Sequence, residues 1–168
     1  MAVYIHEQEG EGDREVIELA ALLHDIADPK FHDGDEDKGS QLACNFLVKN
    51  GYPMEKAEHI QSIIKHVSFK GVLKQPTINS IEFQIVQDAD RLDAIGAIGI
   101  ARAFNYGGYK HREIYEPDMP LREYSSSKEY HSSNATTINH FYEKLLKLKD
   151  LMNTPTGRQI AEERHQFM

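Results

Sequence analysis

The sequence holds one cysteine, no tryptophan and no long hydrophobic run. A lone thiol cannot form an internal disulfide, and Cys44 lies at helical spacing among apolar residues, so we expect a buried, inert thiol. No apolar stretch approaches membrane-spanning length, and residues 1–7 lack the features of a signal peptide. We therefore expect no disulfide framework, no membrane association and a cytoplasmic location.

Positive charge is also scarce, with 19 Lys and Arg against 27 Asp and Glu and a net charge of −8. Because phosphate backbones attract basic surfaces, this balance predicts no binding to bulk nucleic acid. A small phosphorylated molecule stays compatible, because a bound cation would cancel part of the local negative charge. At 168 residues and 40% hydrophobic content, we expect one domain over residues 1–168 with a single core.

Apolar residues recur at a spacing near 3.6, while alternation with a period of two is hardly present, which predicts an all-α fold. Helices are expected at residues 13–26, 38–50, 54–67, 79–105, 134–150 and 155–167. A break is expected near Asp93, inside the segment 79–105. Gly96 and Gly99 leave one helix surface small enough for close approach of a neighbouring helix. Thr154 and Pro155 suit the cap and first position of the last helix.

The most informative motif is the doublet His24-Asp25, at the end of the apolar helical run 17–23. A second acidic run, residues 88–93, lies in another apolar helical stretch. Adjacent helical residues project about 100° apart, so the doublet can present an imidazole nitrogen and a carboxylate oxygen to one point. Such a mixed ligand set suits Mn²⁺, Fe²⁺, Co²⁺, Ni²⁺ or Zn²⁺. The alternative is that His24 caps the helix and the carboxylates are solvated or salt-bridged.

At these residues the chain resembles the HD-domain metal-dependent phosphohydrolase superfamily, whose pattern is a His, then His-Asp, then a distant Asp. The resemblance is to a bacterial branch of small, stand-alone HD hydrolases; it extends through residues 140–146 and covers most of the chain. It implies an HD-domain helical bundle and a divalent metal ion, one of Mn, Fe, Co, Ni, Zn or Mg. The superfamily's Ala-Asp-Arg-Leu pattern maps the distant ligand to Asp90. The implied metal ligands are His24, Asp25 and Asp90, while Asp88 and Asp93 would support the ligands or the fold.

The superfamily's first metal histidine has no match in this chain. It belongs to a helix before the doublet's helix, and residues 1–5 resemble the tail of that helix. His6 lacks the surrounding pattern, so we expect it to be a surface residue. We expect the chain to be truncated at its N-terminus. Because residues 164–168 end without a helix stop signal, we expect truncation at the C-terminus as well.

Asp28 follows His24 at i+4, so it is expected at the mouth of the site. A carboxylate there can position or deprotonate an attacking water, and the superfamily often carries an acidic residue close after the doublet. The alternative is a turn residue before Pro29.

Three further residues, Lys30, His66 and Arg112, are expected to contact substrate phosphate. For His66, a second metal ion is the alternative ligand. A purely structural His66 is equally compatible with the sequence, and His59, seven residues earlier on the same helix, is expected to be peripheral. The sequence thus predicts a metal-dependent phosphohydrolase acting on a small phosphorylated substrate, with a nucleotide as the favoured class and a phosphomonoester or pyrophosphate bond as target. The alternative is a non-catalytic HD-fold domain for ligand sensing or interaction, inactive because the first metal histidine is missing.

Overall fold

The structure, a computed structural model, describes residues 1–27, 37–67, 78–122 and 135–168. Its helices are α1 (Ala2–Glu9), α2 (Arg14–Leu23), α3 (Lys38–Lys49), α4 (Met54–Val67), α5 (Ile81–Asp93), α6 (Gly96–Tyr109), α8 (Thr137–Glu143), the 3₁₀ helix η2 (Leu145–Leu151) and α9 (Pro155–Phe167). No strand occurs within the described ranges, and the predicted all-α class is confirmed. In the same ranges, no helix has the length and apolar character needed to cross a membrane.

The chain divides into two compact units. Among the described residues, the first unit comprises residues 1–27, 37–67 and 78–90, and the second comprises residues 91–122 and 135–168. Helix α5 begins in the first unit and ends in the second. The expectation of a single domain stays a prediction.

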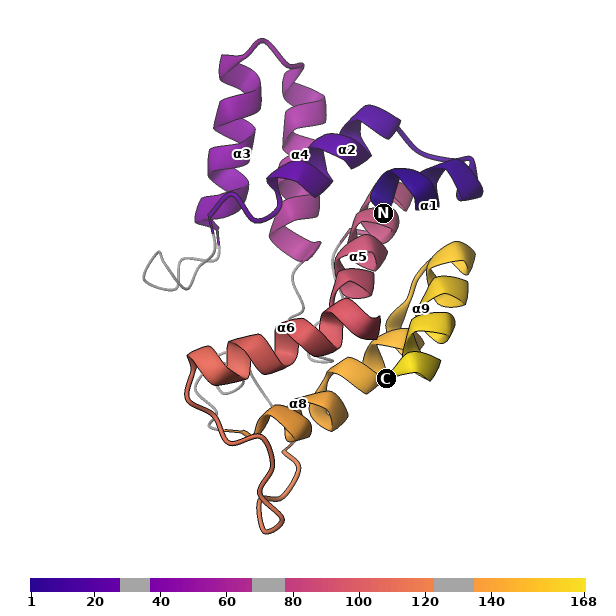
Figure 1. Ribbon diagram of the computed structural model, residues 1–168. Coiled ribbons are helices and arrows are strands. Elements are labelled where there is room, and N and C mark those ends of the chain that lie inside the picture. The colour runs from indigo at the N-terminus through magenta and orange to yellow at the C-terminus, as the bar shows by residue number, and fades with distance from the viewer. Residues whose placement is uncertain (28–36, 68–77, 123–134) are drawn as a thin grey trace. The chain divides into compact units, whose positions relative to one another are not determined.

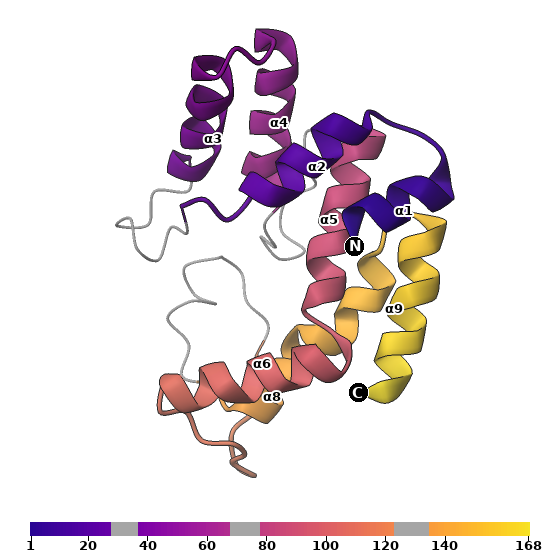
Figure 2. The ribbon, with the colours of Figure 1, turned by 45° about the horizontal axis from the view of Figure 1, so that its top comes forward.

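In the first unit, α3 and α4 lie side by side, α2 packs on α4, and α1 packs on α2 (Figure 1; Figure 2). The turn between α3 and α4 contains Gly51 at φ 83°, a left-handed conformation that glycine adopts without steric cost. Fully buried side chains from four helices, Ile5, Ile17, Ile60 and Phe83, contribute to the core. Cys44 is half-buried on α3.

In the second unit, α6 packs against α8 and α9, and η2 connects these last two helices while contacting both (Figure 1). Its buried apolar residues include Leu92, Ile95, Leu148 and Ala161. Thr154 caps α9 by accepting a hydrogen bond from the Gly157 amide, with Pro155 at the first position, as predicted.

Most predicted helix bounds agree with the structure to within one or two residues, and the expected break inside 79–105 is confirmed. Helix α5 ends at Asp93, and α6 begins at Gly96 with φ 80° and continues to Tyr109. The prediction of one continuous helix over 134–150 is wrong. At Lys144 the backbone turns to φ −135° and ψ −62°, and beyond it buried Leu145 and Leu148, three residues apart, suit the three-residue turn of a 3₁₀ helix.

Candidate metal centre

His24 lies at the end of α2, where the last turn of a helix leaves carbonyl groups without helical partners. Its Nδ1 is 2.8 Å from the carbonyl oxygen of Ala21. Because a carbonyl oxygen only accepts, Nδ1 carries the hydrogen and donates it. In the neutral ring, Nε2 then keeps its lone pair. The end of the helix thus determines which ring nitrogen is available as a ligand.

Two carboxylates face that nitrogen. Asp25 Oδ2 lies 3.4 Å from His24 Nε2, and Asp90 Oδ1, in the last turn of α5, lies 3.7 Å from the same atom. The structure therefore brings these three residues together within the first unit. Their side chains are 25% exposed for His24, 37% for Asp90 and 83% for Asp25, so Asp25 extends furthest into solvent.

The electrostatics of this cluster favour a cation at Nε2. Interaction with the Asp90 carboxylate raises the pKa of His24 to about 9; burial opposes this shift, and the Ala21 carbonyl and the charge of Asp25 add to it. Two negative groups beside one nitrogen are satisfied either by a proton on that nitrogen or by a metal ion between the three groups.

The donor types, one imidazole and two carboxylates, suit a divalent metal. Ligand atoms held about 2.0–2.2 Å from one tetrahedral ion are about 3.3–3.6 Å apart, close to the observed nitrogen–oxygen separations. The Nδ1 bond to a backbone carbonyl is the support that metal-binding histidines usually have. Even so, in the part of the chain that the structure describes, no three His, Cys, Asp or Glu side chains form a ready metal cage.

The structure gives the other predicted residues different surroundings. His66 is half-buried in the last turn of α4, with Nδ1 2.8 Å from the Ser62 carbonyl oxygen. Arg112 follows α6 in the second unit, where its guanidinium carbon lies 5.6 Å from the centre of the Tyr106 ring. Asp28 and Lys30 lie outside the described residues. The predicted roles of these four residues stay predictions.

The acidic residues on either side of Asp90 differ from it and from each other. Asp88 is fully buried. Asp93 belongs to the second unit, is 62% exposed and forms an ion pair with Arg102 of α6.

His6, expected to be a surface residue, is half-buried in α1 and contacts the carbonyl oxygen of Glu11.

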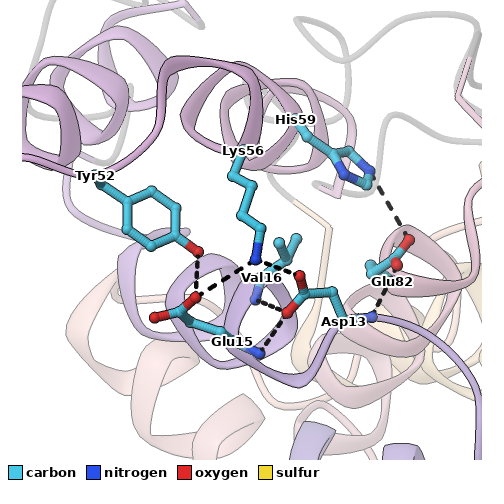
Figure 3. A network of polar contacts seen from close by, with 7 residues as sticks. All are labelled: Asp13, Glu15, Val16, Tyr52, Lys56, His59 and Glu82. Atoms are coloured by element: carbon cyan, nitrogen blue, oxygen red, sulfur yellow. Dashed lines mark hydrogen bonds and ion pairs between the residues drawn. The ribbon is translucent and has the colours of Figure 1, made fainter.

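A polar network at the first turns of α2 and α5 was not singled out by the sequence patterns (Figure 3). It includes Asp13 and Glu82, which are 69 positions apart, and His59, whose Nε2 is 3.0 Å from Ser80 Oγ. Ser80 Oγ accepts from the Phe83 amide as a helix cap, so a serine just before an apolar-periodic segment was a local signal for this region, as was Asp13 before α2.

Comparison with known proteins assigns the family. Residues 1–95 match the family model for the HD domain. The uncharacterized protein YpgQ of Bacillus subtilis (strain 168) is 42% identical over 171 residues, covering 100% of this chain and 74% of YpgQ. A crystal structure of a Lactobacillus plantarum protein has a TM-score of 0.83 and 40% identity, and covers 98% of this chain and 76% of that one.

A Bacillus thuringiensis structure described as an HD-superfamily hydrolase has a TM-score of 0.74 and 45% identity over 100% of this chain and 74% of that one. A structure of YpgQ in complex with ADP has a TM-score of 0.75 and 40% identity over 99% of this chain and 74% of that one. The all-α fold, the matched domain and these relatives agree with the predicted resemblance. The chain belongs to the HD-domain family and has the fold of the HD-superfamily hydrolases.

Proposed function

We propose that this protein is a metal-dependent phosphohydrolase acting on a small phosphorylated molecule. The observation that supports this most is the orientation of His24. Its Nδ1 donates a hydrogen bond to the Ala21 carbonyl oxygen, while Nε2 faces the carboxylates of Asp25 and Asp90 at 3.4 and 3.7 Å. In this proposal His24, Asp25 and Asp90 hold the metal ion.

When bound, a divalent metal would lower the pKa of a coordinated water and neutralise charge on phosphoryl oxygens. The remaining roles, positioning of the attacking water and binding of phosphate, belong to other residues of the chain. Asp28 positions the attacking water, and Lys30, His66 and Arg112 bind phosphate oxygens. An arginine suits this task because its planar, permanently charged fork matches two phosphate oxygens at once.

Nucleotides are the proposed substrate class. The related protein YpgQ has been crystallised with ADP, at 40% identity and with 99% of this chain covered. ADP contains both a terminal phosphate and a phosphoanhydride bond, so the target is a phosphomonoester or a pyrophosphate bond of such a molecule. A cytoplasmic location, where nucleotides are abundant, is part of the same proposal.

The test is a nucleotide panel on protein stripped with a chelator and reloaded with Mn²⁺, Co²⁺ or Mg²⁺. Phosphate and pyrophosphate are detected separately, because the product identifies the bond that is cleaved. We expect hydrolysis only after reloading, and none in the Asp90→Ala variant. Metal-saturated protein that cleaves no phosphorylated substrate would overturn the proposal.

The second candidate is a non-catalytic HD-fold module that senses a ligand or binds a partner. Two observations favour it: the described residues form no ready metal cage, and Asp25 is 83% exposed. The same panel separates the two, because a sensing module would bind a nucleotide with or without metal and release no product.

A further inference from the structure

Helices α2 and α5, which carry the ligands of the candidate metal centre, are also joined at their first turns (Figure 3). Asp13 caps α2, because its Oδ1 accepts from the amides of Glu15 and Val16 at 3.0 and 3.4 Å. The backbone N–H of Asp13 itself lies outside the helix and donates to Glu82 Oε1 at 3.0 Å. Because Glu82 is in the first turn of α5, this bond ties the start of one helix to the start of the other.

Close packing holds the same junction. Gly12, just before the cap, has φ 93°, and a Cβ placed there would lie 3.0 Å from Ile81 Cγ2 and 3.4 Å from Glu82 Oε1. The backbone therefore meets the first turn of α5 with no room for a side chain. The Glu82 side chain is 13% exposed, so its hydrogen bond to Asp13 is little weakened by water.

Helix α4 supports both members of the junction. Lys56 Nζ lies 2.7 Å from Asp13 Oδ2, and His59 Nε2 lies 3.9 Å from Glu82 Oε2 (Figure 3). Burial alone would raise the pKa of Glu82, but hydrogen bonds from the Asp13 amide, its own amide and Ser80 lower it overall. Glu82 is thus an ionised acceptor, the stronger kind of partner for a backbone N–H.

The two helices lead from this junction to the metal ligands. An α-helix rises 1.5 Å per residue, so His24 lies about 16 Å from Asp13 along the axis of α2. Asp90 lies about 12 Å from Glu82 along the axis of α5. A change of about 5° in the direction of α2 at the junction would move His24 by about 1.4 Å, whereas metal–ligand distances tolerate only about 0.2 Å. The contact between His24 Nε2 and Asp90 Oδ1 at 3.7 Å therefore depends on how α2 is held at its start.

We propose that Glu82 is a positioning residue for the metal centre: by binding the Asp13 amide, it sets the direction of α2 against α5 and so brings His24 to Asp90. This inference rests on the proposed function, because it concerns the same ligands. Glu82 itself touches none of the ligand side chains; it acts through the backbone before α2.

The test compares Mn²⁺ affinity, measured by electron paramagnetic resonance, in Glu82→Ala and Glu82→Gln. The glutamine keeps an oxygen that can accept from the Asp13 amide, so we expect its affinity to stay within a few-fold of wild type. The alanine has no acceptor, and we expect affinity to fall about tenfold or more, as when groups that orient metal ligands are removed. Thermal unfolding of each variant verifies that it is folded.

A matched control is Thr154→Val, which removes the cap hydrogen bond of 2.9 Å at the start of α9 in the second unit. It is expected to lower stability and leave Mn²⁺ affinity unchanged. A folded Glu82→Ala variant with wild-type affinity would overturn the positioning role, and so would a Glu82→Gln variant as weak as the alanine.

A second measurement needs no metal. We expect a nuclear Overhauser contact between the His24 ring and the Asp90 side chain in wild type and in Glu82→Gln, and its loss in Glu82→Ala. If wild type binds no Mn²⁺, the proposed function fails, while this contact still decides the positioning role: its persistence in Glu82→Ala overturns that role.

Discussion

At the scale of single residues, the candidate centre shows how position separates side chains of the same kind. Asp90 and Asp93 occur three residues apart in one acidic run. Asp90 is 37% exposed and faces His24, whereas Asp93 is 62% exposed and pairs with Arg102. An exposed ion pair contributes about 0–1 kcal/mol, so Asp93 has a minor structural role and Asp90 is the candidate ligand.

This difference predicts unequal effects of truncation. Asp90→Ala removes a proposed metal ligand, and we expect metal-dependent hydrolysis to fall by more than the roughly 10- to 100-fold typical of groups that only support ligands. Asp93→Ala is expected to keep most of the activity. Steady-state rates at saturating Mn²⁺ measure both, and equal losses in the two variants would contradict the assignment of Asp90.

At the scale of elements, the junction between α5 and α6 depends on two glycines with different tasks. Gly96 starts α6 at φ 80°, and a Cβ there would lie 3.2 Å from Cγ of Arg164 on α9. This agrees with the expected close approach of a neighbouring helix. At Gly99 the close atoms are instead the carbonyl group of Ala94, which lies between the two helices.

Alanine substitutions in α6 should therefore have opposite signs. Gly99→Ala places a methyl group against backbone that cannot move aside, and we expect it to lower the free energy of unfolding by about 1–3 kcal/mol. A methyl group at Gly108 would meet no atom within 4 Å, and there alanine should raise stability by up to about 1 kcal/mol through its higher helix propensity. Urea unfolding measures both, and a Gly99→Ala protein as stable as wild type would contradict the packing argument.

At the scale of the whole molecule, ligand binding and protonation couple to folding. A metal bound by His24, Asp25 and Asp90 would link α2 to α5. In the sequence these two helices are separated by α3 and α4. A ligand that binds only the folded state stabilises it by about 2.7 kcal/mol at 100 times its dissociation constant.

We therefore expect Mn²⁺ to raise the melting temperature of the wild-type protein by several degrees, since about 1 kcal/mol corresponds to roughly 2–4 °C in a chain of this size. Differential scanning calorimetry with and without Mn²⁺ measures the shift. Asp90→Ala is expected to show little or none. An equal shift in both proteins would mean that the metal binds elsewhere.

Acid should destabilise the protein through His140. Burial, together with the charges of Lys144 and Arg112, lowers the pKa of His140 from its ordinary value of 6.5 to about 4. Between these two values the unfolded chain binds a proton that the folded chain does not, so stability falls as the pH drops from about 6.5 to 4.

We expect His140→Gln to flatten the dependence of melting temperature on pH in that window. The control is His111→Asn, at an exposed position with φ 53°, a conformation that asparagine tolerates. Its pH profile should match wild type, and an unchanged slope in His140→Gln would assign the acid sensitivity to other groups.

Local sequence by itself determined the helices, because apolar spacing, caps and breaks act within a few residues of one another. The cap at Thr154 and the break after Asp93 could be predicted for this reason. The doublet His24-Asp25 could be recognised because its two residues are adjacent at the end of an apolar helical run. Asp90 was assigned through the family's pattern. Over 134–150 the apolar spacing did not distinguish one continuous helix from two short ones. There the burial of Leu145 and Leu148 favours a separate 3₁₀ helix after α8.

Tertiary structure alone decided which distant groups meet. Nothing in the neighbourhood of Glu82 indicates that it binds the amide of Asp13, 69 positions away, and nothing near Asp93 indicates that it pairs with Arg102. Such contacts depend on how packed helices are oriented, and the periodicity of a single helix specifies which face is buried but not which partner it meets. The side-chain chemistry of the candidate centre is therefore readable in the sequence, while its geometry and support come from the packing of α2, α4 and α5.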